Sequence, residues 1–167
     1  MFEDKIIGAL NYFTKRKVEH HTDIYTELMN ECKKKFTKEE MRLINKAYET
    51  AKYLHRNQKR NSGEPYIIHP LYVAYIALKE LDLHDANSIC AELLHDTVED
   101  CKMTEKLLIK HFNQDIADLV MGVTKITNLN FNSKEEQEAY NYRLLLLAVL
   151  KSYRTILIKL ADRLHNM

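Results

Sequence analysis

Residues 89–100 read ICAELLHDTVED, a stretch in which apolar side chains recur at helical spacing beside a cluster of acids. Asp85 is a suitable N-cap, so we predict one helix from this residue toward Glu99. The His95-Asp96 pair falls inside the apolar repeat. Burying an ionised carboxylate there costs several kcal/mol unless a cation or hydrogen bonds compensate it. The stretch therefore predicts a helix and a polar site together.

The rest of the chain favours helices as well. Its 167 residues include three glycines and two prolines, too few for the turns of a many-stranded β-fold. Thr37 and Ser133 each begin a capping box, and Thr104 is a further N-cap candidate. Pro70 suits the first turn of a helix, and the helix after Thr37 should end near Gln58. We predict an all-α bundle of about 8–10 helices.

Nothing in the sequence marks a linker or an internal repeat. We interpret residues 1–36 as a lead of two weakly amphipathic helices that packs on the main domain, residues 37–167. The final helix, from residue 153, reaches the end of the chain without a C-cap signal. We therefore expect a domain that is truncated at its C-terminus.

Charge and cysteine usage limit the classes of protein. Twenty-five Lys and Arg against 24 Asp and Glu give a net charge of +1, with no broad field for DNA or an anionic membrane. The longest apolar run, residues 144–150, is far shorter than the ~20 residues of a membrane span. The N-terminus lacks a signal-peptide pattern, and the three cysteines suggest reduced thiols. We expect a cytoplasmic protein that binds neither DNA nor membrane.

The His95-Asp96 pair offers one nitrogen and one oxygen donor for a metal ion. Such a mixed site favours Mn²⁺, Fe²⁺ or Zn²⁺ over Mg²⁺ or Cu⁺. By residue type, His69 at a helix start and Asp162 on the polar stripe of the last helix are the best candidates for two further ligands. An acid outside the ligand set could accept a proton from the attacking water. On spacing alone, a capped buried histidine beside a surface acidic helix end is the favoured interpretation.

Residues 59–66, KRNSGEPY, form the clearest loop. Two interpretations stay open. The loop is either a solvated basic helix end or a clamp in which Arg60 holds phosphate oxygens or stacks on a purine. Tyr66 could border a pocket, whereas we expect His165 to be a structural or surface residue.

Four ordered motifs carry a resemblance to a known family. They are RNSGEPYIIHP at 60–70, LLHDTVED at 93–100, GVTK at 122–125 and IKLADRLHNM at 158–167. Together they resemble the hydrolase (HD) domain of the RelA/SpoT-homologue alarmone enzymes over about residues 37–167. The resemblance implies an all-helical bundle of the HD phosphohydrolase type.

The resemblance also implies an activity. It indicates a Mn²⁺-dependent guanosine-3′,5′-bis(diphosphate) 3′-diphosphatase, which converts ppGpp or pppGpp and water to GDP or GTP and pyrophosphate in stringent-response alarmone turnover. It assigns metal binding to His69, His95, Asp96 and Asp162. It assigns water activation to Glu99 and Asp100, and nucleotide contacts to Arg60, Ser62 and Asn166.

Two further expectations follow from the resemblance. The chain would be the hydrolase part of a longer bacterial enzyme that also has a synthetase domain, and any ribosome link would arise only through that full-length protein. The alternative from another functional class is a non-catalytic module that senses guanine nucleotides.

Overall fold

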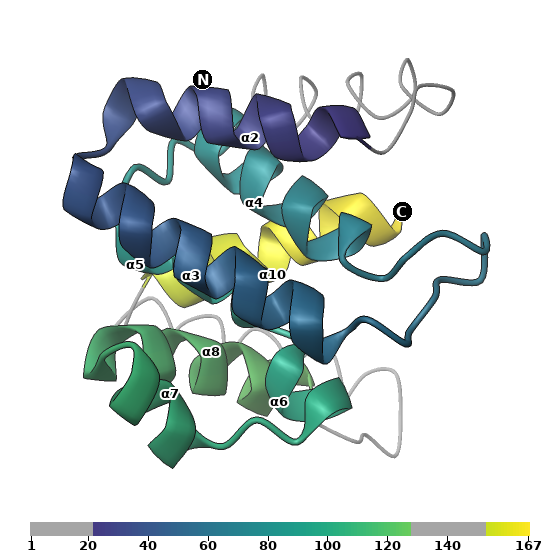
Figure 1. Ribbon diagram of the computed structural model, residues 1–167. Coiled ribbons are helices and arrows are strands. Elements are labelled where there is room, and N and C mark those ends of the chain that lie inside the picture. Colours follow the sequence, from purple (N-terminus) through teal and green to yellow (C-terminus); the bar gives the residue numbers. More distant parts are fainter. Residues whose placement is uncertain (1–21, 128–152) are drawn as a thin grey trace, which may run out of the picture.

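The computed structural model describes residues 22–127 and 153–167, which form eight α-helices (Figure 1). The β-structure of these residues is a single isolated bridge between Lys59 and Pro65, so the predicted all-α class is confirmed. The first predicted lead helix, the Ser133 capping box and the apolar run 144–150 lie outside the described residues. The helices are α2 (Thr22–Lys35), α3 (Lys38–Leu54), α4 (Ile68–Lys79), α5 (Ala86–Leu94), α6 (Thr97–Cys101), α7 (Glu105–His111), α8 (Gln114–Thr127) and α10 (Tyr153–Asn166).

The predicted N-caps are confirmed where the structure describes them. Thr37 and Glu40 form the capping box of α3, in which each side chain bonds the other residue's backbone N–H. Asp85 and Thr104 each accept from the backbone N–H three residues later, at the starts of α5 and α7. These caps satisfy amide groups that have no partner within the helix.

The predicted end of α3 near Gln58 is wrong, because the helix stops at Leu54. The next backbone bonds, from Arg56 to the Tyr53 carbonyl and from Gln58 to the His55 carbonyl, span three residues and not four. The His55 Nδ1 atom also lies 2.6 Å from the Gln58 side-chain oxygen. The chain therefore tightens into a turn before it enters the 59–66 loop.

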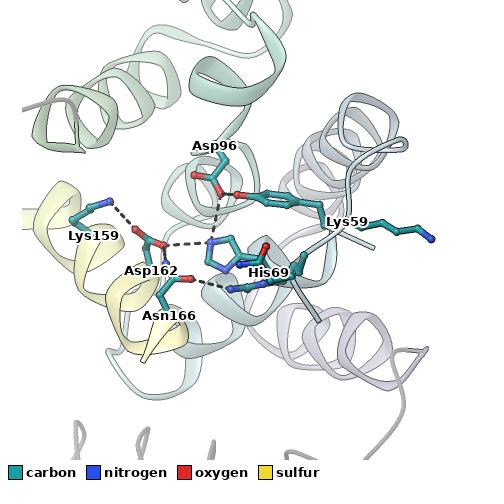
Figure 2. Close-up of a pocket in the computed structure, with 9 residues that line it drawn as sticks. Lys59, His69, Asp96, Lys159, Asp162 and Asn166 are labelled. Atoms are coloured by element: carbon teal, nitrogen blue, oxygen red, sulfur yellow. Dashed lines mark hydrogen bonds and ion pairs between the residues drawn. The ribbon is translucent and has the colours of Figure 1, made fainter. Parts of the chain in front are cut away.

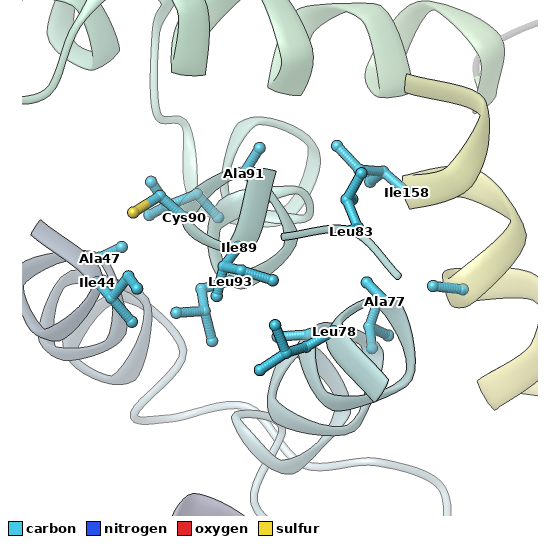
Figure 3. Close-up of a cluster of buried hydrophobic side chains, with 14 of the residues drawn as sticks. Ile44, Ala47, Ala77, Leu78, Leu83, Ile89, Cys90, Ala91, Leu93 and Ile158 are labelled. Atoms are coloured by element: carbon cyan, nitrogen blue, oxygen red, sulfur yellow. The ribbon is translucent and has the colours of Figure 1, made fainter. Parts of the chain in front are cut away.

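Helix α5 is the centre of the bundle and packs against α3, α4, α8 and α10. Every described side chain on it is buried apart from partial exposure at Asn87. Figure 3 shows Ile89 and Leu93 of α5 between Ile44 of α3 and Leu78 of α4. All four of these apolar residues are fully buried. The burial of α5 around almost its whole circumference makes it the centre of the core.

Helix α2 belongs to the same core, since Ile24, Leu28 and Cys32 pack in it and the helix contacts α4. The division of the chain at residues 36 and 37 stays a prediction. No helix among the described residues is long and apolar enough to cross a membrane.

Helix α10 is fixed at its start against α8. A Cβ atom on Gly122 would lie 3.0 Å from the Thr155 methyl group, so glycine allows the close approach of the two helices. Arg154 donates to both carboxylate oxygens of Asp115, at 2.8 and 2.6 Å, and to Asp85 at 3.1 Å. These contacts hold α10 beside α5, with its last turns directed toward the loop at 59–66 (Figure 1).

Candidate active site

The helix predicted to run without interruption toward Glu99 is in fact two helices. His95 and Asp96 separate α5 from α6. The His95 Nδ1 atom bonds the Glu92 carbonyl at 2.7 Å, and the Thr97 hydroxyl donates to the Leu94 carbonyl at 2.6 Å. Side chains thus occupy carbonyls that a continuous helix would use for its own backbone bonds.

The four predicted metal ligands lie together, although they come from three separate elements, and Figure 2 shows three of them, His69, Asp96 and Asp162. His69 Nε2 lies 3.4 Å from Asp96 Oδ2 and 3.3 Å from Asp162 Oδ1. His95 Nε2 lies 3.1 Å from Asp96 Oδ1 and 3.8 Å from Asp162 Oδ1. The start of α4, the α5–α6 junction and α10 each contribute, and Asp96 is the most exposed member, at 17% of its side chain.

The donors fit a divalent cation. A backbone carbonyl can only accept, so the Nδ1 atom of His95 carries the proton and its Nε2 atom carries a free lone pair. That Nε2 atom is buried and makes no hydrogen bond among the described residues. Donors about 2.1 Å from one ion lie about 3.0 Å apart at right angles and about 3.4 Å apart at tetrahedral angles, close to the separations observed.

The electrostatics of the cluster keep its acids ionised. Burial alone raises the pKa of Asp96, but the adjacent imidazoles of His95 and His69 outweigh it and hold this pKa at about 2. Burial also opposes ionisation of Asp162, yet the contact with His69 and the bond from Lys159 hold its pKa well below the usual range. Burial lowers the pKa of His69. Ionised carboxylates and a neutral imidazole are the forms that bind metal.

The cluster opens into a pocket of about 380 Å³, within the usual range for small-molecule sites. His69, Asp96 and Asp162 line it. The other lining residues are mostly basic and polar: Lys59, Arg60, Asn61, Tyr66, Lys159 and Asn166. A cation site beside basic side chains suits a phosphate-bearing ligand.

The 59–66 loop places Arg60 in the lining of this pocket, as the clamp interpretation of the loop requires. Gly63 has φ +88°, which favours glycine, and its amide donates to the Arg60 carbonyl at 2.8 Å. The Arg60 Nη2 atom donates to Asn166 at 3.0 Å. Ser62 does not line the pocket, and its hydroxyl lies 3.2 Å from the Glu64 carboxylate.

The two predicted water-activating acids, Glu99 and Asp100, lie on the exposed side of α6 and outside the pocket lining. Asp100 is nonetheless connected to the predicted ligand Asp96 through the backbone, because its amide donates to the Asp96 carbonyl at 2.9 Å. Tyr66 borders the pocket, as expected, and its hydroxyl donates to Asp96 at 2.7 Å. Burial and then the charge of Asp96 raise the pKa of Tyr66.

Two residues near the centre were not predicted as functional. Lys159 lines the pocket and donates to Asp162 Oδ2 at 2.7 Å. Its helical spacing with Asp162 and Asn166 on one polar stripe could have identified it. His165 lies beside His69, with 2.6 Å between the two Nδ1 atoms, and only the fold reveals this contact.

The site and the helical bundle agree with the comparison to protein families. The family model described as an HD domain matches residues 47–167, and the chain belongs to this family. Among its relatives, the guanosine-3′,5′-bis(diphosphate) 3′-pyrophosphohydrolase of Vibrio cholerae is 42% identical over 144 residues. The bifunctional (p)ppGpp synthase/hydrolase SpoT of Escherichia coli is 43% identical over 129 residues, and a GTP pyrophosphokinase of Myxococcus xanthus is 48% identical over 128 residues.

These alignments cover 86%, 77% and 75% of this chain but only 20%, 18% and 17% of the three relatives. The chain therefore spans about a fifth of the length of the curated relatives it matches. The resemblance to the HD domain of the RelA/SpoT homologues is confirmed.

Proposed function

We propose that the chain hydrolyses the 3′-pyrophosphate of ppGpp and pppGpp, releasing pyrophosphate and GDP or GTP, with a divalent metal ion. The observation that supports this most strongly is the buried cluster of His69, His95 and Asp162, with the partly buried Asp96 beside it, which opens onto a pocket with basic side chains. The names of two relatives describe this hydrolysis.

His69, His95, Asp96 and Asp162 would hold the metal, and we propose Mn²⁺ as the ion. The unpartnered Nε2 atom of His95 supports this assignment, because an orphaned buried lone pair is costly without a cation. When bound, the cation supplies a Lewis acid that neutralises charge on the scissile phosphate and lowers the pKa of the attacking water. The bond from Lys159 occupies Asp162 Oδ2, which leaves Oδ1 facing the histidines.

Glu99 and Asp100 are proposed to accept the proton of the attacking water. Both acids are exposed and lie on the short helix that directly follows Asp96. This position supports the role, since an acid that accepts a proton from the attacking water must lie close to the metal ligands and must pass the proton on to solvent. Removing the charge of such a base slows the chemical step without removing a metal ligand.

Arg60 is proposed to lie against the guanine, Asn166 to contact the sugar, and Ser62 to contact the base from the loop tip. The position of Arg60 and Asn166 in the pocket wall supports the first two roles. Lys59 and Lys159 add positive charge for the phosphates, and Figure 2 shows Lys59 extending away from the ligand cluster.

The proposal extends to the whole protein. Residues 37–167 would be the hydrolase domain, with residues 1–36 packed on it, inside a longer bacterial synthetase/hydrolase that works in the cytoplasm. The greater length of the relatives and the core contacts of α2 support this organisation. Any ribosome link would belong to the full-length protein.

The test is pyrophosphate release from ppGpp by the 167-residue chain with added Mn²⁺. We expect release that Asp96→Ala and Glu99→Ala abolish. Asp118→Ala, an exposed acid on α8 outside the site, should retain it. Stabilisation of the chain by ppGpp without any release would contradict the enzyme and support a sensing module.

A further inference from the structure

His165 occupies a position between the nucleotide loop and the ligand cluster. Its Nδ1 atom lies 2.6 Å from His69 Nδ1 and 3.0 Å from Arg60 Nη1. Its ring stacks on Tyr72, with centroids 5.1 Å apart and planes 15° apart. The stacking fixes the plane of the imidazole, so the Nδ1 atom stays directed at both neighbours.

The chemistry of Arg60 decides the proton positions in this group. A guanidinium group can only donate, so a proton on His165 Nδ1 would face another N–H. His165 therefore carries its proton on Nε2 and accepts through Nδ1. Since that atom accepts, His69 must donate its own Nδ1–H to it. The lone pair of His69 is then on Nε2, the atom that faces Asp96 and Asp162.

The same arginine also reaches the other side of the cluster. Its Nη2 atom donates to Asn166 Oδ1 at 3.0 Å, and Asn166 Nδ2 donates to Asp162 Oδ1 at 2.6 Å. The two ends of the Arg60 fork thus contact the hydrogen-bond partners of two different ligands. This second contact holds the guanidinium in the place where it fixes the His165 tautomer.

We propose that His165 is a positioning residue that fixes the tautomer and orientation of His69 for metal binding. The inference rests on the proposed function in one respect, the role of His69 as a ligand. Groups that accept the second N–H of a metal-binding histidine commonly change metal affinity 10–100-fold when they are removed.

The first test measures the Mn²⁺ dissociation constant of the 167-residue chain by calorimetry. His165→Phe keeps a ring for the Tyr72 stack but removes the acceptor, and we expect a dissociation constant about 10–100-fold higher. His165→Asn restores an acceptor oxygen near the Nδ1 position and should recover most of the affinity. The matched control is His84→Phe, at an exposed histidine remote from the pocket, which should not change the value.

The outcomes separate this inference from the proposed function. Unchanged Mn²⁺ affinity in His165→Phe, with tight binding by the wild type, overturns the positioning role and leaves the hydrolase proposal standing. Failure of the wild type to bind any divalent ion contradicts the proposed function itself.

The second test reads the tautomers directly and does not depend on a variant that folds. Long-range ¹H–¹⁵N correlation spectra of the metal-free wild type near neutral pH should show His69 protonated at Nδ1 and His165 protonated at Nε2. The reverse pair of tautomers would overturn the inference.

Discussion

Glu92 on α5 and Asp162 on α10 are both buried carboxyl groups near the ligand cluster, but their pKa values move in opposite directions. Burial, followed by the charge of Asp162, raises the pKa of Glu92 well above its usual value. Neither oxygen of Glu92 has a hydrogen-bond partner among the described residues. Burial also raises the pKa of Asp162, yet the net shift of this pKa is downward.

The difference lies in the donors that surround each acid. Asp162 receives bonds from Lys159 at 2.7 Å and Asn166 at 2.6 Å, and it faces His69. Glu92 is fully buried, lacks such donors among the described residues and feels the like charge of Asp162. Hydrogen-bond donors, and not depth of burial, therefore decide whether the pKa of a buried acid is lowered or raised.

The largest expected effect comes from removing the charge of Asp162. Asp162→Asn keeps the size of the side chain and removes its charge, and we expect ppGpp hydrolysis to fall by about 10³–10⁴-fold, equivalent to several kcal/mol of transition-state stabilisation. Steady-state pyrophosphate release measures this change, with Asp118→Asn as the control. Activity within a few-fold of wild type would show that the charge of Asp162 is not needed.

A smaller effect is expected from the metal itself. Mn²⁺ at about 100 times its dissociation constant should stabilise the fold by about 2.7 kcal/mol, which raises the Tm by roughly 5–10 °C for a chain of this size. Differential scanning calorimetry with Mn²⁺ and then with excess chelator measures the shift. Asp96→Ala should lose it, and an equal shift in that variant would place the ion elsewhere.

The smallest effect concerns Glu92 and depends on pH. Because its folded-state pKa is raised, the stability that its proton contributes is fully present below the unfolded-state pKa and is lost as the pH rises through the folded-state value. Glu92→Gln has no such proton to lose. Its Tm advantage over wild type in chelator should therefore grow as the pH rises above about 5 and reach a few °C.

An advantage that is constant with pH would mean that Glu92 is already ionised in the folded chain. In that case the contrast with Asp162 would disappear.

Local signals predicted the parts of the fold that local chemistry controls. The caps at Thr37, Asp85 and Thr104 depend on a side chain and an amide three residues away, so the sequence contains the whole interaction. The four candidate metal ligands were predicted from residue type and from the family resemblance. The structure brings two of them, His69 and Asp162, together although they are 93 positions apart in the sequence.

The junction between α5 and α6 and the contacts between distant segments could not be predicted in this way. Periodicity placed His95 inside one helix, because it cannot show that the imidazole and the Thr97 hydroxyl take backbone carbonyls. The burial of Glu92 could not be predicted either, because the sequence does not show that four helices pack against α5. The role of His165 depends on a loop more than 100 residues away, and no local pattern contains it.

The interruption between α5 and α6 has a consequence for protein engineering. Thr97→Ala would increase intrinsic helix propensity, the usual route to a more thermostable variant. Here it would also free the Leu94 carbonyl and let regular backbone bonding spread across the junction, in competition for the Glu92 carbonyl that orients His95. At this point in the chain a more regular helix means a less well-oriented imidazole, so stabilising design should leave residues 94–97 unchanged.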